Sequence, residues 1–288
     1  MEEKQIAYFV SSHGFGHASR SAAIMAAVRR QDPQIQIDVF TETPEWFFKE
    51  SEVGIRHYFR TQSDIGIIQK SPMEMDIPAT ERAVGDFLFG LPAKAEQIGV
   101  FLREHAYRLV LCDISPLGIL AAVSAGIPSI LFENFTWDWI YQPFADQFPG
   151  FFGIIHEMAG IYALADSHCQ LIPFCGGIKS HARILQPVSR DPQKDRSEIR
   201  RLLGIAPEDK MGLISMGGIP DRFENISGAD FERQGIKLVI PGSFADAYKN
   251  EALILLPHHS GFYHPDLVAA ADFVIGKAGY STIAEVVA

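Results

Sequence analysis

Short apolar runs alternate with longer helix-like runs from the beginning of the chain. Residues 5–12 (QIAYFVSS) are rich in β-forming side chains, and a loop with glycines separates them from residues 21–33 (SAAIMAAVRRQDP). That second run ends in two arginines and a proline, as the C-terminus of a helix does. Apolar side chains then alternate at period two over residues 35–41 (IQIDVFT). The pattern predicts a strand, a helix and a second strand.

The same order recurs in the middle of the chain, over residues 107–113 (YRLVLCD), 115–128 (SPLGILAAVSAGIP) and 129–134 (SILFEN). The apolar stretch from Leu109 to Phe132 is long enough to compare with a membrane span, but its aspartate, prolines and glycines suit a lipid-exposed helix poorly. We therefore predict strand, helix and strand within a buried core. Parallel strands joined by helices indicate a doubly wound sheet, with a ligand site at the carboxyl ends of the strands.

The pattern also predicts two domains. A polar, proline-containing segment follows QLIPF, and residues 195–204 (DRSEIRRLLG) then predict a surface helix that Gly204 ends. A second α/β pattern begins at MGLISMGG and continues to the end of the chain. We expect an N-terminal Rossmann-like domain over residues 1–180, a linker over 181–195 and a C-terminal Rossmann-like domain over 196–288. The two would face each other across a cleft that holds two substrates.

Composition narrows the classes of function. Thirty-five acidic against 25 basic residues give a formal charge of −10, which argues against nucleic acid as a partner. Three scattered cysteines and the lack of a CxxC pair argue against a disulfide framework and against a zinc site. The N-terminus has no signal-peptide pattern, so we expect no export, no transmembrane segment and a cytoplasmic location.

The first loop that could carry chemistry is SSHGFGHAS. Gly14 and Gly16 allow close backbone approach at the start of a helix, where free N–H groups favour an anion or a sugar oxygen. His13 or His17 could supply a base near neutral pH. The alternative is a tight turn whose histidines only make local hydrogen bonds. Because Ser19 stands where GxGxxG requires a third glycine, a dinucleotide site is disfavoured.

Two further loops could hold phosphate. The pair Gly217 and Gly218 follows a strand, although a plain turn explains it equally well. A cluster then surrounds the start of the last helix, where lysine and hydroxyls suit a diphosphate and a carboxylate one turn further suits a ribose: Lys277, Gly279, Ser281, Thr282 and Glu285. A simple capped helix is the alternative. No P-loop, DxD or HExxH occurs, and the spacing of His258, His259 and His264 fits no standard metal site.

Taken together, the loops HGFGHASR and GKAGYSTIAE resemble those of the two-domain glycosyltransferases of the GT-B fold, in the family of the lipid II N-acetylglucosaminyltransferase. Four segments are similar to the glycosyltransferase-like N-terminal domain of plant L-arabinokinases: HGFGHASR, FENFTWDWIY, PVSRDPQKDRSEIRRLLGI and FYHPDLVAAADFVIGKAGYSTIAE. The resemblance implies inverting, metal-independent transfer of a sugar from a nucleoside diphosphate sugar, a UDP-sugar in the first instance, to a hydroxyl acceptor. It implies no kinase activity and no cofactor beyond the nucleotide sugar.

The resemblance also implies roles for individual residues. His17 would be the general base, with His13 as the second candidate. Gly279 and Thr282 would contact the diphosphate, which would leave toward Gly217, Gly218 and Lys277, and Glu285 would bind the ribose. Residues at or after strand ends would line the acceptor side, unless they form a purely structural loop: Asp113, Glu133, Asn134, Trp137 and Trp139.

The resemblance has one gap at its C-terminal end. Relatives of this type continue past the position of Glu285 with a further strand, a loop that binds the donor sugar and a closing helix. We therefore expect the second domain to be incomplete and to self-associate through surface that would otherwise be covered. The alternatives to a transferase are a non-catalytic nucleotide-sugar-binding module and a nucleotide-sugar epimerase of the same fold.

Overall fold

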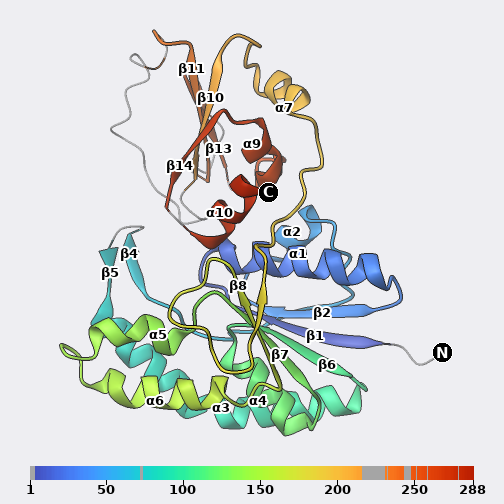
Figure 1. Ribbon diagram of the computed structural model, residues 1–288, viewed down its shortest axis with the longest axis vertical. Coiled ribbons are helices and arrows are strands. Elements are labelled where there is room, and N and C mark those ends of the chain that lie inside the picture. The colour runs from blue at the N-terminus through green and yellow to red at the C-terminus, as the bar shows by residue number, and fades with distance from the viewer. Residues whose placement is uncertain are drawn as a thin grey trace. The chain divides into compact units, whose positions relative to one another are not determined.

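The computed structural model describes residues 4–71, 74–215, 231, 233–242, 248–250, 252–257, 259–277 and 279–288. The chain divides into two compact units, unit 1 with Met1–Lys70 and Met75–Val188, and unit 2 with Ser71–Glu74 and Ser189–Ala288. Each unit has its own sheet and its own hydrophobic cores (Figure 1). The predicted loop residues Gly217 and Gly218 lie outside the described residues.

The sheet of unit 1 has seven strands in the order β3-β2-β1-β6-β7-β8-β9, all parallel. Their bounds are β1 (Gln5–Val10), β2 (Gln36–Thr41), β3 (Tyr58–Arg60), β6 (Leu109–Asp113), β7 (Ser129–Glu133), β8 (Ser167–Leu171) and β9 (Arg183–Leu185). A short pair, β4 (Gln69–Ser71) and β5 (Glu74–Met75), lies apart from this sheet. The helices that accompany the strands are α1 (Phe15–Gln31), α2 (Glu45–Glu50), α3 (Ile77–Glu104), α4 (Pro116–Ala125), α5 (Trp137–Tyr141) and α6 (Gly150–Tyr162), with a 3₁₀ turn at Gln142–Phe144.

Both faces of this sheet are covered. Helices α3, α4 and α6 lie on one face and α1 and α2 on the other (Figure 1). Successive residues of β1 therefore enter different cores: Ala7 and Phe9 pack toward α3 and α4, and Tyr8 and Val10 pack toward α1. This arrangement explains why β1 reads as a continuous apolar run rather than an alternating one.

The predicted strand, helix and strand between Leu109 and Phe132 are confirmed as β6, α4 and β7. The Ser115 hydroxyl caps α4 by accepting a hydrogen bond from the Gly118 amide at 3.1 Å, and Gly126 ends the helix in the left-handed region with φ of 68°. No helix in the described part of the chain is long and apolar enough to cross a bilayer.

Unit 2 has a five-stranded sheet in the order β12-β13-β11-β10-β14, parallel except for β12. The strands are β10 (Lys210–Ser215), β11 (Ile236–Pro241), β12 (Tyr248–Lys249), β13 (Leu253–Leu256) and β14 (Phe273–Gly276), and the helices with described bounds are α7 (Arg196–Leu203), α9 (His264–Ala270) and α10 (Tyr280–Val287). Helix α7 ends at Gly204, which has the predicted left-handed conformation. The expectation of two doubly wound α/β units is confirmed.

Candidate active site

The order of the strands in unit 1 determines where a ligand site forms. The chain runs from β1 outward to β2 and β3, then returns to place β6 on the other side of β1. Loops leave in opposite directions at such a switch point and open a crevice at the carboxyl ends of the two strands. Val10 at the end of β1 pairs with Asp113 at the end of β6. The loop with Gly14 and His17 follows β1 at this point.

A buried hydrogen bond joins His17 to Asp113 at this switch point. The Nδ1 atom of His17 lies 2.6 Å from Oδ1 of Asp113, and the two residues are 6% and 0% exposed. Gly14 allows the approach because it precedes α1 with φ of 74°, a conformation that favours glycine. Helix α1 then begins at Phe15, so that His17 lies in its first turn.

Arg20 neutralises the Asp113 carboxylate. Its Nε and Nη2 atoms each donate to a different oxygen of Asp113 at 2.7 Å, and the Ser21 hydroxyl donates at 3.2 Å. Burial by itself would raise the pKa of Asp113, but the charges and hydrogen bonds of Arg20 and His17 outweigh it and lower the pKa to about 2. Asp113 is therefore ionised at every pH near neutrality.

The charge on Asp113 selects the tautomer of His17. An ionised carboxylate has no proton to donate, so the proton of this hydrogen bond must belong to Nδ1 of the imidazole. The Nη2 atom of Arg20 lies 3.2 Å from the same nitrogen, but a protonated Nδ1 has no lone pair to offer it. The lone pair of neutral His17 is thus on Nε2, the arrangement that a general base requires.

Aromatic side chains surround the two histidines of the loop. The His17 ring contacts Phe135 edge-on, with centroids 5.5 Å apart, and lies 6.2 Å from Trp137. His13 packs edge-on against the same tryptophan at 5.3 Å. Its ring occupies space left by Gly66, where a Cβ would lie only 2.6 Å from Nδ1 of His13. The loop therefore brings both predicted histidines to Trp137, and it brings His17 to Asp113.

A second buried acid lies beneath this cluster. Trp137 donates its indole N–H to Oδ2 of Asp64 at 2.8 Å. Burial raises the pKa of Asp64 to about 6, because its contacts with Ser11, Trp137 and His17 lower it by less than burial raises it. Asp64 thus titrates in the range where many enzymes work.

The residues predicted to line the acceptor side do not all lie in the same cluster. Asn134 joins the His17 cluster, because its Oδ1 accepts a hydrogen bond from Nη1 of Arg20 at 2.5 Å. Trp137 joins it through Asp64 and the two histidines. Glu133 belongs instead to another group, since its carboxylate lies 3.1 Å from Nε2 of His168 and 3.7 Å from Nζ of Lys179. Trp139 lies half-exposed against Gly176.

Unit 2 has an analogous switch point between β10 and β14, where Ser215 pairs with Gly276. Lys277 follows β14 and is exposed, and Gly279 precedes α10. Ser281 and Thr282 occupy the first turn of α10. The predicted donor-side lysine, glycine and hydroxyls are thus brought together at the amino end of one helix, where unpaired N–H groups favour an anion.

Glu285 lies in a partly buried chain of polar side chains within unit 2. Its Oε1 accepts from Nη2 of Arg190 at 3.0 Å, and its Oε2 lies 2.8 Å from Nδ1 of His264, whose Nε2 is 3.0 Å from the Ser215 hydroxyl. The Glu285 side chain is 2% exposed. Both oxygens of the carboxylate that sequence reasoning assigned to a ribose are therefore already engaged by protein groups.

Comparison with known proteins adds a curated relative and several solved structures. L-arabinokinase of Arabidopsis thaliana is 28% identical over 292 residues, which cover 97% of this chain and 27% of that protein. UGT2 of Phytolacca americana, solved with UDP-2-fluoro-glucose and pterostilbene, superposes with a TM-score of 0.56 at 12% identity over 99% of this chain and 78% of that chain. MnaA of S. aureus, solved with UDP, gives 0.55 at 13% identity over 96% and 74%. No protein-family model matches the chain.

These superpositions decide the fold class. The fold is that of the GT-B glycosyltransferases. The alignment of this GT-B chain with L-arabinokinase spans 27% of the length of that protein. TM-scores of 0.56 and 0.55 establish a shared fold, and at identities of 12% and 13% the chemistry depends on the side chains of this chain.

Sequence reasoning missed several members of both clusters. Arg20 is three residues after His17 on the same helix face, a spacing that could have indicated it. Asp64 and Arg190 gave no signal, because only tertiary packing brings them to their partners. His264 was noted as one of three nearby histidines, and its link to Glu285 depends on the packing of α9 against α10. Within the described residues, no three His, Cys, Asp or Glu side chains form a group suited to a metal.

Proposed function

We propose that this chain transfers a sugar from a nucleoside diphosphate sugar to a hydroxyl acceptor, with His17 as the general base. The observation that carries the proposal is the buried pair in which the ionised Asp113 fixes the proton of His17 on Nδ1 and leaves Nε2 as acceptor. The pair lies at the switch point of a sheet in a chain with the GT-B fold. A charged, hydrogen-bonded carboxylate also stabilises the imidazolium that forms during proton transfer.

The proposed reaction is a single displacement. Nε2 of His17 takes the proton of the acceptor hydroxyl as its oxygen forms a bond to the anomeric carbon. The bond from that carbon to the phosphate oxygen breaks, and the nucleoside diphosphate leaves with the electron pair. Attack opposite the leaving group inverts the anomeric configuration. Lys277 and the amide groups at the start of α10 would stabilise the leaving charge without a metal ion.

Unit 2 would bind the donor. A UDP-linked sugar is favoured because the solved relatives of Phytolacca americana and S. aureus carry UDP-2-fluoro-glucose and UDP. Gly279, Ser281 and Thr282 would contact the diphosphate. For Glu285 to bind the ribose, a hydroxyl would have to share an oxygen with Arg190 or His264 or replace one of them. Phosphoryl transfer forms no part of the proposal, since the chain spans 27% of the kinase it matches.

The test measures donor binding and turnover separately. We expect calorimetry to show UDP binding to the purified protein, and release of UDP from a UDP-sugar to depend on a hydroxyl acceptor. His17→Gln should reduce turnover by about 10²-fold to 10⁴-fold, the usual contribution of a general base, and change the Kd of UDP less than twofold. Asp113→Asn should reduce turnover similarly, because a neutral amide no longer selects the tautomer.

His156→Gln is the matched control, since His156 is exposed on α6 and should affect neither measurement. Full turnover in His17→Gln, with UDP binding intact, would transfer the role of base to His13 or to the substrate. A folded protein that binds no nucleoside diphosphate would contradict the whole proposal.

A further inference from the structure

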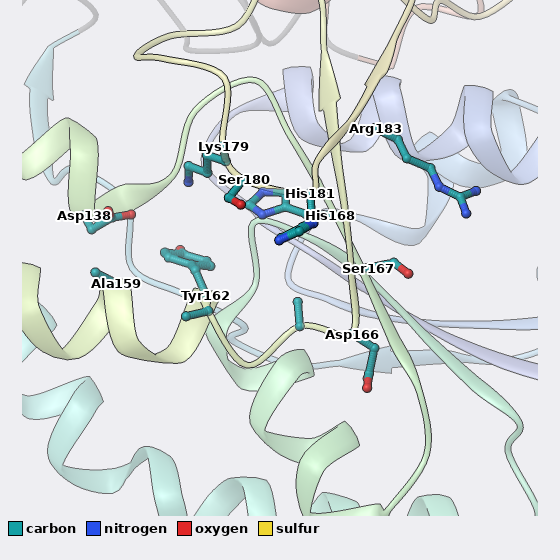
Figure 2. Close-up of a pocket in the computed structure, with 12 residues that line it drawn as sticks. Asp138, Ala159, Tyr162, Asp166, Ser167, His168, Lys179, Ser180, His181 and Arg183 are labelled. Atoms are coloured by element: carbon teal, nitrogen blue, oxygen red, sulfur yellow. The ribbon is translucent and has the colours of Figure 1, made fainter.

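Unit 1 contains a pocket of about 750 Å³ that the proposed reaction does not use. Its lining comes from α5, α6, β8 and the segment that leads into β9 (Figure 2). This volume lies within the range of about 300–1,000 Å³ that is typical of small-molecule sites. It is formed entirely by unit 1, beside the strand that carries Glu133.

Glu133 is the unusual residue next to this pocket. Its side chain is fully buried, and neither oxygen has a hydrogen-bond partner among the described residues. His168 and Lys179 lie 3.1 and 3.7 Å from it, near enough for charge compensation but not aligned as hydrogen bonds. Because an isolated buried carboxylate is very costly, this geometry keeps the Lys179 ammonium and the His168 imidazole beside the pocket.

Four of the seven buried polar side-chain atoms without a hydrogen-bond partner in the described chain belong to this one place. They are both carboxylate oxygens of Glu133, Oδ1 of Asp138 and Nε2 of His168. Buried polar groups in folded proteins are almost always paired, so such a concentration needs a physical explanation. The contact of 3.1 Å between His168 Nε2 and Glu133 Oε1 accounts for two of these atoms, and Asp138, which carries a third, lines the pocket together with His168.

The walls of the pocket differ in charge. Figure 2 shows Lys179, Ser180, His181 and His168 grouped together, with Asp138 to one side. The Lys179 ammonium donates to the Thr136 hydroxyl at 3.1 Å, which leaves it two further N–H donors. Ser180 and His181 are exposed. The grouped residues offer donors to an anion, and Asp138 offers an acceptor to a hydroxyl.

We propose that this pocket binds a phosphorylated sugar or polyol, with its phosphate on Lys179 and His181 and its hydroxyls toward Asp138. The pocket offers an anion-binding end within a chain of net charge −10, where long-range attraction cannot account for anion binding. A ligand with a phosphate alone would leave the carboxylate end unmatched, and an uncharged sugar would leave the cationic end unmatched.

The segment Glu133–Asp138 connects this site to the His17 cluster. Three of its residues, Glu133, Thr136 and Asp138, contact or line the pocket region. The other three, Asn134, Phe135 and Trp137, contact Arg20, His17 or both histidines of the loop. The pocket and the His17 cluster thus lie on opposite sides of one short segment. The binding inference itself does not depend on the proposed transfer reaction.

The experiment is titration calorimetry of the full chain with glucose 6-phosphate, ribose 5-phosphate, inorganic phosphate and glucose. At least one sugar phosphate should bind, and glucose and inorganic phosphate should each bind at least tenfold more weakly than that sugar phosphate. Lys179→Gln combined with His181→Asn should weaken its binding at least tenfold. Asparagine is chosen at position 181 because it tolerates the positive φ of 62° found there. Asp138→Asn should weaken the binding of the sugar phosphate but leave the binding of inorganic phosphate unchanged.

Two control variants locate the binding. Lys277→Gln removes the lysine of the donor loop in unit 2, and Lys49→Gln removes an exposed lysine of α2, so both should bind the sugar phosphate as the unmodified protein does. Circular dichroism establishes that each variant is folded. The inference is overturned if neither sugar phosphate binds, if binding persists in the Lys179→Gln and His181→Asn variant, or if it is lost in Lys277→Gln.

Discussion

Asp113 and Asp64 are both buried within the His17 region, and burial raises the pKa of each. The outcomes differ because Asp113 has a bidentate arginine, whereas the hydrogen-bond partners of Asp64 among the described residues, Ser11 and Trp137, are uncharged. The pKa values are about 2 for Asp113 and about 6 for Asp64. The same site thus contains one carboxylate fixed as an anion and another that takes up a proton under mild conditions.

The raised pKa of Asp64 predicts that the stability of the protein depends on pH. Its folded pKa of about 6 lies above an unfolded value of about 3.9, so ionised Asp64 lowers stability above pH 6, and this cost disappears as the pH falls from about 6 to 4. Asp64→Asn removes the charge but keeps an acceptor for Trp137. We expect the variant to be more stable at pH 7.5 by about 2–3 kcal/mol and to gain nothing at pH 4, as measured by urea unfolding. An equal difference at the two pH values would contradict this account.

At the scale of elements, the packing of α4 depends on small residues. A Cβ on Gly118 would lie 2.7 Å from Phe9 of β1 and from Sγ of Cys112 in β6. A Cβ on Gly99 of α3 would lie 2.5 Å from the Ser124 hydroxyl of α4. Helix α4 therefore lies unusually close to the strands that carry the His17 site, and the position of Ser115 at its amino end follows from that approach.

The close packing predicts opposite effects for the same substitution at two glycines. Gly118→Ala should lower stability by about 1–3 kcal/mol, because the added methyl group overlaps neighbours within a packed core. Gly85→Ala in α3, where no atom lies within 4 Å of the added carbon, should raise stability by about 0.5–1 kcal/mol through helix propensity. Thermal unfolding of the two variants checks both signs. A stabilised Gly118→Ala would mean that α4 can move away from β1.

Sequence patterns predicted the elements with local signals and failed where the signal was mixed. The strands β1, β2, β6 and β7 and the helices α1, α4 and α7 follow from apolar runs, caps and terminal glycines. No helix was predicted over Ile77–Glu104, where Gly85, Gly90 and Pro92 interrupt the pattern and packing against α4 and α6 stabilises the helix instead. At the site, adjacent positions were predicted to act together, yet Glu133 and Asn134 contact different groups, because β7 ends at Glu133 and the chain turns at Asn134.

At the scale of the whole molecule, each unit repeats one arrangement: a switch point in a parallel sheet, a following loop and a polar cluster in the helix that starts there. Each unit also has its own hydrophobic cores. The proposed reaction assigns the base to unit 1 and the donor to unit 2. A donor ligand should therefore stabilise unit 2 selectively.

The three tryptophans make this selectivity measurable, because Trp46, Trp137 and Trp139 all belong to unit 1. Tryptophan fluorescence therefore follows unfolding of unit 1, and calorimetry follows both units. UDP at 100 times its Kd should stabilise unit 2 by about 2.7 kcal/mol and raise a calorimetric transition that fluorescence does not report. Lys277→Gln should reduce that shift. A UDP-dependent shift in the fluorescence transition alone would place the nucleotide in unit 1.

The segment Glu133–Asp138 should tolerate substitutions better than insertions or deletions. Each of them contacts a partner on one of two sides, with Asn134 reaching Arg20 and Thr136 reaching Lys179. A substitution alters one such partner, but an inserted or deleted residue would shift every later member and exchange the two sets of neighbours. We therefore expect the number of residues between the end of β7 and Trp137 to be the same in distant homologues of this unit, even where the side chains themselves differ.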